Sequence, residues 1–314
     1  MMNRHKMRNR ASFVVAALLA LPAASAQAKT QAGMDLSVNG GYASNPYLDS
    51  VSSTGTATFT ASAQPYVTFR APTSTTTLRG DVSQNIYSQN YADTTDYSIS
   101  SVSDIAISPI TSINANAGYS SQVQNTLLPV LSPIGGIPTN PNLPVILDPS
   151  APASLTRRVR TLYGGASLKT AFSPRDSLTI GVNGAQVRYP EQSILTNSYD
   201  SLGGQLSYMR RISGATSIGL TLGASHNNYL DRVAGDSSSY SPSLTVQTKL
   251  APRLELNLSG GVTFSDIDVI GGTIHQTSLS GQGSLCRTGD RSNFCLQASR
   301  SVVPTGYAGI SRST

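Results

Sequence analysis

The 314-residue chain has no tryptophan, two cysteines and three histidines, and charged residues make up only 12% of it. A structural zinc site needs about four ligands, and the two histidines in the body of the chain, His226 and His275, are far apart in sequence. The sequence contains no G-x-S-x-G, H-E-x-x-H or P-loop motif. We therefore expect a protein that is not an enzyme and that holds no metal or cofactor.

Long apolar runs are also absent after residue 28, which excludes a transmembrane helix in that part of the chain. The N-terminus combines a basic segment, MMNRHKMRNR, with the short apolar run ASFVVAALLALPAASA and small-residue A-x-A sequences. This pattern is typical of a secretory signal peptide, here residues 1–28, and the run is shorter than the roughly 20 residues of a membrane anchor. After secretion through the inner membrane, a membrane location would have to be reached by β-structure.

A large positive charge is absent too once the signal peptide is set aside. The whole chain has a formal charge of +6, but removal of Arg4, Lys6, Arg8 and Arg10 leaves 18 basic and 16 acidic residues. A net charge near +2 is too small for the electrostatic footprint of a nucleic-acid-binding protein. We expect no nucleic-acid partner.

Alternation of apolar and polar residues is what the chain does contain. In TATFTASAQPYVTFRAP, which begins at Thr56, apolar residues occupy odd positions and polar residues even ones. Pro65 interrupts this segment and predicts a bulge or a missing ladder bond. The pattern recurs down the chain and gives about 13 strands. We predict an all-β chain whose antiparallel strands run up and down in a transmembrane β-barrel, over residues 29–314.

The connections between these strands alternate in length. Short turns are expected at 71–75, 108–111, 173–176, 212–215 and 251–253, and longer polar stretches near 44–54, 91–96, 125–157, 189–198, 228–238 and 266–273. Short periplasmic turns and long extracellular loops are the layout of a bacterial outer-membrane barrel. Segment 125–157 contains seven prolines. We expect it to be one long extracellular loop, either folded back into the pore or disordered.

A secreted β-sandwich or β-helix would alternate in the same way, but the aromatic residues separate the two classes. On the apolar face, one aromatic group falls at the long-loop ends and another at the short-turn ends, with aliphatic residues and glycine between them. The first group is Tyr42, Tyr97, Tyr240 and Phe264; the second is Phe69, Phe172, Tyr208 and Phe294. Two belts around an aliphatic middle favour a bilayer. Arg300 conflicts with this assignment, because it falls on the lipid face of the last strand, predicted over 294–303, unless that strand has a bulge or ends earlier.

If the apolar face meets lipid, the polar face lines a lumen rich in Ser, Thr, Asn, Gln and Gly. Its predicted charges, five basic and three acidic, are Arg70, Arg79, Lys169, Arg211, Lys249, Asp81, Asp104 and Glu255. A slight positive excess would bias the pore toward anionic small solutes or carboxylates. The alternative is ordinary hydration of the lumen, with opposite charges paired between neighbouring strands.

The two cysteines lie at the ends of CRTGDRSNFC, which could be a metal clip, a redox pair or a stapled turn. A metal clip lacks further ligands, and a redox pair is usually spaced C-x-x-C. Leu285 and Phe294 take the lipid phase, so Cys286 and Cys295 take the same lumen phase on adjacent strands. In the oxidising periplasm, this placement predicts a cross-strand disulfide at a periplasmic turn.

Two stretches within residues 188–314, RYPEQSILTNSYDSLGGQLSYMRRISGATSIGLTLGASHNNYLDR and CLQASRSVVPTGYAGISRST, resemble proteobacterial outer-membrane barrels of the β-barrel porin 2 group. That group includes barrels linked to exopolysaccharide export. The resemblance implies a pore or conduit in the bacterial outer membrane, with polysaccharide as the leading substrate. Outer-membrane lipid and the barrel-insertion machinery are the implied partners. No catalytic residues are carried over.

The end of the chain departs from that pattern. Outer-membrane barrels usually finish on an aromatic residue and have an even number of strands, whereas this chain ends GISRST after about 13 strands. We expect a C-terminally truncated barrel of 14–16 strands when complete, in which residues 312–314 start the next strand; a miscounted strand is the other explanation. Two further function classes stay open. One is a non-transporting surface barrel whose loops bind partners, and the other is a barrel enzyme.

Overall fold

The computed structural model describes residues 29–43, 55–88, 92–123, 158–190, 198–230, 235–269, 272–289, 292–300, 302–303 and 312–313. The predicted signal peptide (1–28) and the proline-rich segment 125–157 lie outside the described residues, so both stay predictions. Within the described part of the chain, every regular element is a β-strand.

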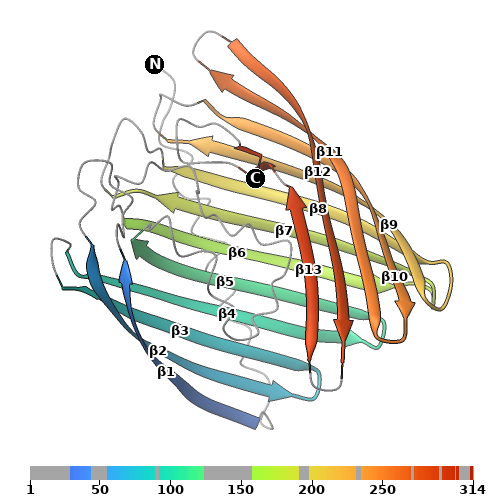
Figure 1. Ribbon diagram of the computed structural model, residues 1–314. Coiled ribbons are helices and arrows are strands. Elements are labelled where there is room, and N and C mark those ends of the chain that lie inside the picture. The colour runs from blue at the N-terminus through green and yellow to red at the C-terminus, as the bar shows by residue number, and fades with distance from the viewer. Residues whose placement is uncertain are drawn as a thin grey trace.

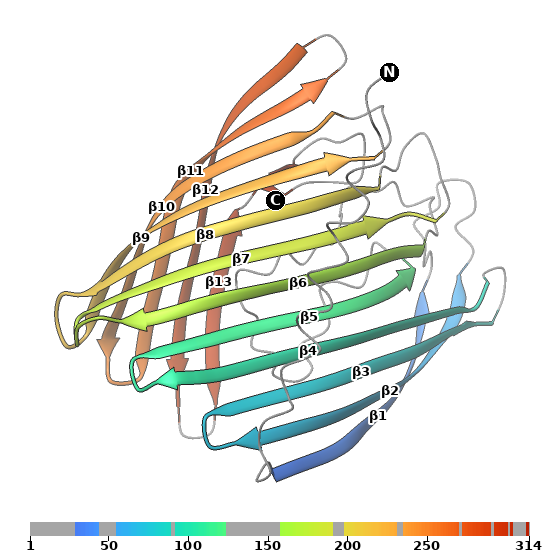
Figure 2. The ribbon, with the colours of Figure 1, turned by 180° about the vertical axis from the view of Figure 1, so that it is seen from behind.

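Thirteen strands form one sheet, in which each strand pairs antiparallel with its neighbours in sequence. They are β1 (Lys29–Ala43), β2 (Thr56–Ala71), β3 (Ser74–Tyr87), β4 (Thr94–Ser108), β5 (Thr111–Val123), β6 (Arg158–Ala171), β7 (Asp176–Arg188), β8 (Tyr199–Arg211), β9 (Thr216–Tyr229), β10 (Ser237–Ala251), β11 (Leu254–Val269), β12 (Gly272–Thr288) and β13 (Asn293–Arg300). The sheet is strongly curved (Figures 1 and 2). The prediction of an all-β chain with about 13 up-and-down antiparallel strands is confirmed.

The two edges of this sheet are not paired with each other. Within the described residues, β1 pairs with β2 alone and β13 with β12 alone. Because strand direction alternates and thirteen is odd, β1 and β13 run in the same direction, and their direct pairing would be parallel. Residues 312–314 were predicted to start a next strand of the barrel. The two of them that the structure describes do not extend this sheet: β15 (Arg312–Ser313) pairs with β14 (Val302–Val303) in a separate two-stranded sheet.

The last strand of the main sheet is shorter than the predicted 294–303. It ends at Arg300, and Val302, which the alternation assigned to it, belongs to β14. Arg300 is opposite Gly281, and Gly281 is opposite Gly260, so the register keeps the arginine on the apolar face. Of the two explanations considered for this residue, the early strand end is the one observed. The conflict with the apolar face persists at the last position of the strand.

All five predicted short turns join consecutive strands, and antiparallel pairing places them at one end of the sheet, the short-turn end. The turn before β7 is held by Ser173, whose Oγ donates to Asp176 Oδ2 at 2.6 Å and accepts from the Asp176 backbone N–H at 2.9 Å. Tyr208 donates to the other carboxylate oxygen at 2.6 Å. The opposite edge of the sheet is called the long-connection end below.

Pro65 causes a missing ladder pairing and no bulge. The β2–β3 register passes from Ala63 opposite Val82 to Tyr66 opposite Arg79, so Gln64 and Pro65 have no partner in β3 while the alignment stays unchanged. This is the effect expected of a residue that has no backbone N–H to donate. It confirms one of the two alternatives predicted for this position.

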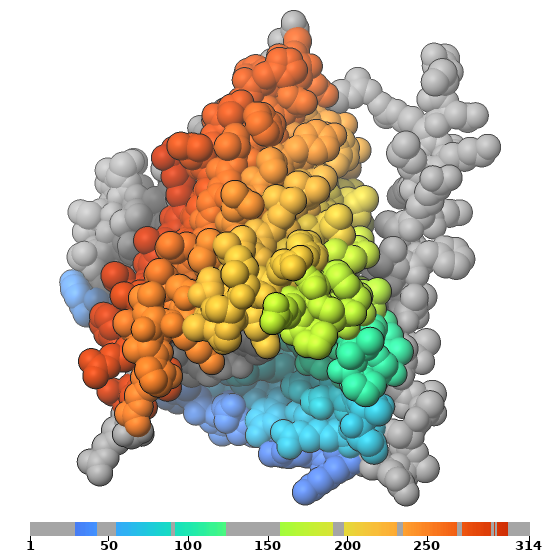
Figure 3. Space-filling view, turned by 90° about the vertical axis from the view of Figure 1, so that its right-hand side faces the viewer, coloured from blue at the N-terminus to red at the C-terminus, as the bar shows by residue number. Residues whose placement is uncertain are grey.

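Side chains alternate between an apolar and a polar face, and the apolar face is the more exposed. On β9, for example, Leu220 and Leu222 are exposed while Thr221 is partly buried. The middle of the apolar face is called the apolar band. Figure 3 shows successive strands side by side over the molecular surface. The band includes Leu78, Val82, Ile99, Leu168, Ile180, Val182, Leu206, Ile218, Leu220, Leu222, Leu244, Leu258, Leu279 and Leu296, all exposed. A chain that leaves this many large apolar side chains exposed lacks the central core of a soluble β-sandwich.

Aromatic residues flank the apolar band at both of its ends. Tyr240 and Phe264 are opposite each other at the long-connection end, and Tyr97 and Tyr119 lie there with ring centroids 6.1 Å apart. At the short-turn end, the rings of Phe172 and Tyr208 stack at 6.2 Å. The register places the other members of the two predicted groups on the same face: Tyr42, Phe69 and Phe294.

Candidate functional site

The polar face of the sheet is the candidate functional surface, and the register places all eight predicted lumen charges on it. Residues that are opposite each other in paired strands lie on the same face of the sheet. Glu255, for instance, is opposite Lys249 of β10 and Cys286 of β12, so the three residues share a face. The same tracing assigns the full set to the polar face: Arg70, Arg79, Asp81, Asp104, Lys169, Arg211, Lys249 and Glu255. Their role in a lumen stays a prediction.

Gln64 links an arginine and a carboxylate at the middle of β2 and β3. Arg79 donates from Nη2 to Gln64 Oε1, and Gln64 Nε2 donates to Asp81 Oδ2 at 2.6 Å. At the short-turn end, Asn114 Nδ2 donates to Asp104 Oδ1 at 2.7 Å. Amide side chains therefore satisfy hydrogen-bond acceptors of these two carboxylates, and Gln64 also bridges Asp81 to a guanidinium group.

Three further charges on the polar face were missed in the sequence: Lys29, Asp35 and Asp96. Asp35 is opposite Gln64, and Asp96 accepts from the backbone N–H of Val123 at 2.7 Å. Strand alternation could have found them, since Asp35 lies between Met34 and Leu36. With them, six basic residues face five acidic ones, so the predicted excess of two positive charges falls to one.

Hydroxyl groups bond across the strands of the polar face at several heights. Ser207 Oγ lies 2.9 Å from Thr221 Oγ1, and Ser225 Oγ lies 2.7 Å from Ser239 Oγ. On β2 and β3, Thr68 Oγ1 lies 3.1 Å from Thr77 Oγ1. Each hydroxyl uses one hydrogen bond in the pair and keeps capacity for another partner. The polar face therefore consists mainly of small polar groups and carries few charges.

Two tyrosines of the polar face lie against glycines directly opposite them. A Cβ on Gly33 would be 2.5 Å from Tyr66 Oη, and a Cβ on Gly118 would be 2.5 Å from Tyr163 Cζ. The register pairs Gly33 with Tyr66 and Gly118 with Tyr163. Glycine therefore leaves the space that each ring occupies, an arrangement known as aromatic rescue of a strand glycine. Both rings lie along the polar face.

The disulfide joins Cys286 of β12 to Cys295 of β13, which are opposite each other in the register, with Cα atoms 4.1 Å apart. The structure thus contains the predicted cross-strand bond on the polar face. The bond closes the short-turn end of the last hairpin and encloses the eight residues 287–294. In the described part of the chain no cysteine is left free.

At the long-connection end, β7 to β9 reverse the polarity of their two faces. The polar face there carries Val187, Tyr189, Tyr199 and Tyr229, and Val159 of β6 packs against them. Val187 and Tyr199 are 0% exposed, and the rings of Tyr199 and Tyr229 lie 5.3 Å apart. The opposite face carries Gln186, Arg188, Asp200 and Asn228 at the same end. This end of the sheet, beyond the aromatic residues, is called the rim below.

The side of the sheet that carries the apolar band is called the outer face below. On the rim, a row of polar residues on this outer face was not predicted as a group. His226, Ser238, Asp266 and His275 occupy successive register positions on β9 to β12. His226 Nδ1 lies 3.0 Å from Ser238 Oγ, and His275 Nδ1 lies 2.6 Å from Asp266 Oδ1. Asp266 therefore contacts His275, whereas Ser238 contacts the other histidine, His226. This order differs from a catalytic triad, in which the acid orients the histidine that serves the nucleophile.

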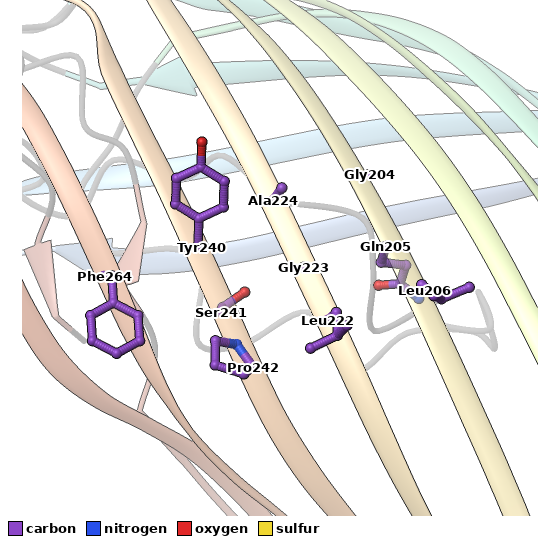
Figure 4. A pocket seen from close by; sticks show the side chains of 10 residues that line it. All are labelled: Gly204, Gln205, Leu206, Leu222, Gly223, Ala224, Tyr240, Ser241, Pro242 and Phe264. Carbon is purple, nitrogen blue, oxygen red and sulfur yellow. The ribbon is translucent and has the colours of Figure 1, made fainter.

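A shallow depression lies in the apolar band, on β8 to β11 (Figure 4). Gly204 and Ala224 form its floor, and the larger side chains Leu206, Leu222, Tyr240, Pro242 and Phe264 stand around it. An open apolar hollow of this kind fits an acyl chain better than a polar substrate. It lies on the face opposite the charges, so it forms no joint site with them.

No helix among the described residues is long and apolar enough to cross a membrane. No group of three or more His, Cys, Asp or Glu side chains there is arranged to hold a metal ion.

Comparison with known proteins gives distant likeness in shape. No protein-family model and no curated protein sequence matches the chain. One similar solved structure is titled "Bacterial polysaccharide outer membrane secretin"; it is 11% identical, with a TM-score of 0.47, covering 89% of this chain and 94% of that one. Another is a NanC porin, 8% identical, with a TM-score of 0.37, covering 82% of this chain and 100% of that one. Membership of the β-barrel porin 2 group therefore stays a prediction.

Proposed function

We propose that the chain is an outer-membrane β-barrel protein whose sheet forms the wall of a pore or conduit for polar solutes. The observation that carries this proposal is the pairing of an exposed apolar band with a hydroxyl- and amide-rich polar face. In hydrocarbon, each unpaired backbone group costs several kcal/mol, so a sheet can cross a bilayer only with its strands hydrogen-bonded to neighbours. Aromatic residues at both ends of the band support the same placement.

Orientation follows from the connections. In outer-membrane barrels the short turns face the periplasm and the long loops face outward. The rim then lies on the extracellular side, and the disulfide lies at a periplasmic turn, where oxidising conditions favour it. Insertion into the membrane would involve the barrel-insertion machinery.

Polysaccharide is the leading substrate class for this conduit, and small anionic solutes are the second. The sequence resemblance to exopolysaccharide-associated barrels supports the first. So do Tyr66 and Tyr163, because aromatic rings lying along a polar wall can contact the apolar faces of sugar rings while nearby hydroxyls exchange hydrogen bonds with them. A single excess positive charge on the polar face gives only weak support to the second.

Conductance in planar bilayers tests the proposal. Residues 29–314, refolded and inserted, should give stable single channels with nearly equal anion and cation permeability. Glu255→Gln should shift the reversal potential toward anions, and Lys249→Gln should shift it toward cations, because both residues lie on the polar face. Arg210→Gln, which removes a positive charge from the opposite face of the sheet, is the matched control and should leave the reversal potential unchanged.

Neutral oligosaccharides should reduce the current reversibly, and Tyr66→Ala should weaken that block. Bilayers that stay silent with correctly inserted protein would contradict the pore and favour a surface barrel that binds partners through its loops. Conductance without any block by sugars would leave a pore and remove polysaccharide as its substrate.

A further inference from the structure

Three arginines lie on the outer face of the rim, on the two neighbouring strands β6 and β7. Arg160 is directly opposite Arg188 in the register, and Arg158 is two residues from Arg160 on the same face. Two acids lie near them: Asp200 of β8 pairs with Arg188, and Asp96 of β4 interacts electrostatically with Arg158. The local balance is therefore three positive charges against two negative.

Two of these guanidinium groups are held in place by backbone carbonyls. Arg158 donates to the carbonyl oxygens of Thr95 at 2.7 Å and Ser121 at 3.3 Å, across β5 to β4. Arg188 donates to the carbonyl oxygen of Tyr199 at 2.9 Å and to Asp200 Oδ1 at 2.6 Å. Side chains fixed in this way lose little further entropy when they bind an anion.

Arg160 completes the cluster and has a different character. It is exposed, and it makes no hydrogen bond or ion pair with the described residues. Like charges directly opposite each other in a sheet are destabilising. Because Asp200 accepts from Arg188 and not from Arg160, the cluster retains an unneutralised positive charge, which an external anion would neutralise.

The position of the three arginines along their strands, relative to the aromatic residues, indicates the source of such an anion. On the same face, Leu162 is one position closer to the middle of the sheet than Arg160, and it is opposite Tyr119. Tyr97 lies in the same register row as Arg160, because both are opposite Ser121. Aromatic side chains on an outer wall mark the depth of lipid headgroups. Arg160 and Arg188 lie in the row of Tyr97 and one position beyond Tyr119, and Arg158 lies one position further out. This is the level of lipid phosphates, and a guanidinium fork matches phosphate oxygens in a bidentate arrangement.

We propose that Arg158, Arg160 and Arg188 form a binding site for the phosphate of an anionic membrane lipid on the outer wall of the barrel. This inference rests on the proposed membrane placement and extends it. The site holds a lipid at one side of the barrel only, because the β11–β12 side of the rim carries Asp266 and Asp268 on its outer face. Two carboxylates there repel the same headgroup.

The absence of tryptophan from the chain makes the site measurable. Tyr119→Trp puts a single fluorophore beside the arginines, and Phe264→Trp puts one at the same end on the acidic side. Each variant is reconstituted in bilayers that contain brominated phosphatidic acid or brominated phosphatidylcholine, and quenching gives the relative affinity of the two lipids at that place. We expect phosphatidic acid to be favoured at least fivefold at position 119 and not at position 264.

Removing the charges should remove this preference. In the Tyr119→Trp background, Arg160→Gln should lower the ratio by roughly fivefold, since one arginine near a membrane surface contributes about 1 kcal/mol. Arg70→Gln, which removes the same charge from the polar face, should leave the ratio unchanged. A wild-type ratio near one, an equal ratio at both reporter positions, or loss of the preference in millimolar inorganic phosphate would overturn the lipid site.

Conductance of the same preparations separates this inference from the pore. Channels that conduct while the quenching ratio stays near one would leave the pore intact and remove the lipid site. A high ratio at position 119 without conductance would support the lipid site and contradict the pore.

Discussion

The apolar band and the rim are built from the same strands, yet they distribute polarity in opposite ways. In the band, Leu220 and Leu222 of β9 face outward and Thr221 faces inward; nearer the strand end, Asn228 faces outward and Tyr229 inward. Alternation continues through both regions without a break in register. What changes is the medium on the outer side, which we infer to be lipid at the band and water at the rim.

This difference shows that strand alternation specifies two faces but not which face meets which medium. In the band, the apolar side chains are exposed in the isolated chain and need lipid to cover them. At the rim, the apolar side chains are buried within the protein, as in a small soluble core. The rim should therefore obey the energetics of a soluble protein, and the band those of a membrane protein.

The largest effect is expected from truncating a tyrosine of the rim core. Tyr199→Ala should lower the free energy of unfolding by about 3–5 kcal/mol, because it removes a fully buried aromatic side chain. Tyr240→Ala is the matched control at the same end on the outer face; Tyr240 is 57% exposed, and we expect a loss of about 1 kcal/mol or less. Denaturant titration of vesicle-inserted protein, followed by circular dichroism, gives both values. Equal losses would mean that the rim has no core of its own.

The second-largest effect on stability is expected from a charge introduced on the outer face, and it should differ between the band and the rim. Leu222→Arg places a cation in the apolar band and should destabilise the inserted protein by roughly 2–4 kcal/mol, whereas Asn228→Arg, six residues along the same face of β9, should cost at most about 1 kcal/mol. Heat-modifiable migration and insertion yield into vesicles report the difference. If both variants insert equally well, the outer face at Leu222 does not contact lipid, and the membrane placement is wrong.

Much of the fold could be predicted from the sequence because period-two alternation is a local signal. The number of strands, the five short turns and the paired placement of Cys286 and Cys295 follow from phase alone. The end of β13 could not be predicted, because Val302 continues the alternation although it pairs with β15. Alternation gives no information about which strand a residue pairs with.

The arginine cluster and the row of His226, Ser238, Asp266 and His275 were missed for a similar reason. Each group comes from different strands, and its members are brought together only by the register. The phase of His226 could have been read from Leu220 and Leu222, but its alignment with Asp266 could not. Positions across a sheet depend on turn lengths and on the shear between strands, which composition and spacing leave open.

The smallest effect concerns the Arg188–Asp200 ion pair on the outer face of the rim, whose side chains are 35% and 41% exposed. If the rim stands in water, Asp200→Asn should cost only about 0.2–1 kcal/mol, and salt should remove most of that loss by screening. Asp268→Asn, which removes an acid from the same rim, is the control; Asp268 accepts from Thr273 Oγ1 at 2.9 Å. The Asp200 variant should also raise the preference for phosphatidic acid at the Tyr119→Trp reporter, because it increases the local positive charge. A salt-insensitive loss well above 1 kcal/mol would mean that the pair lies in a medium of low dielectric constant, so that the outer face of the rim is covered by lipid like the band.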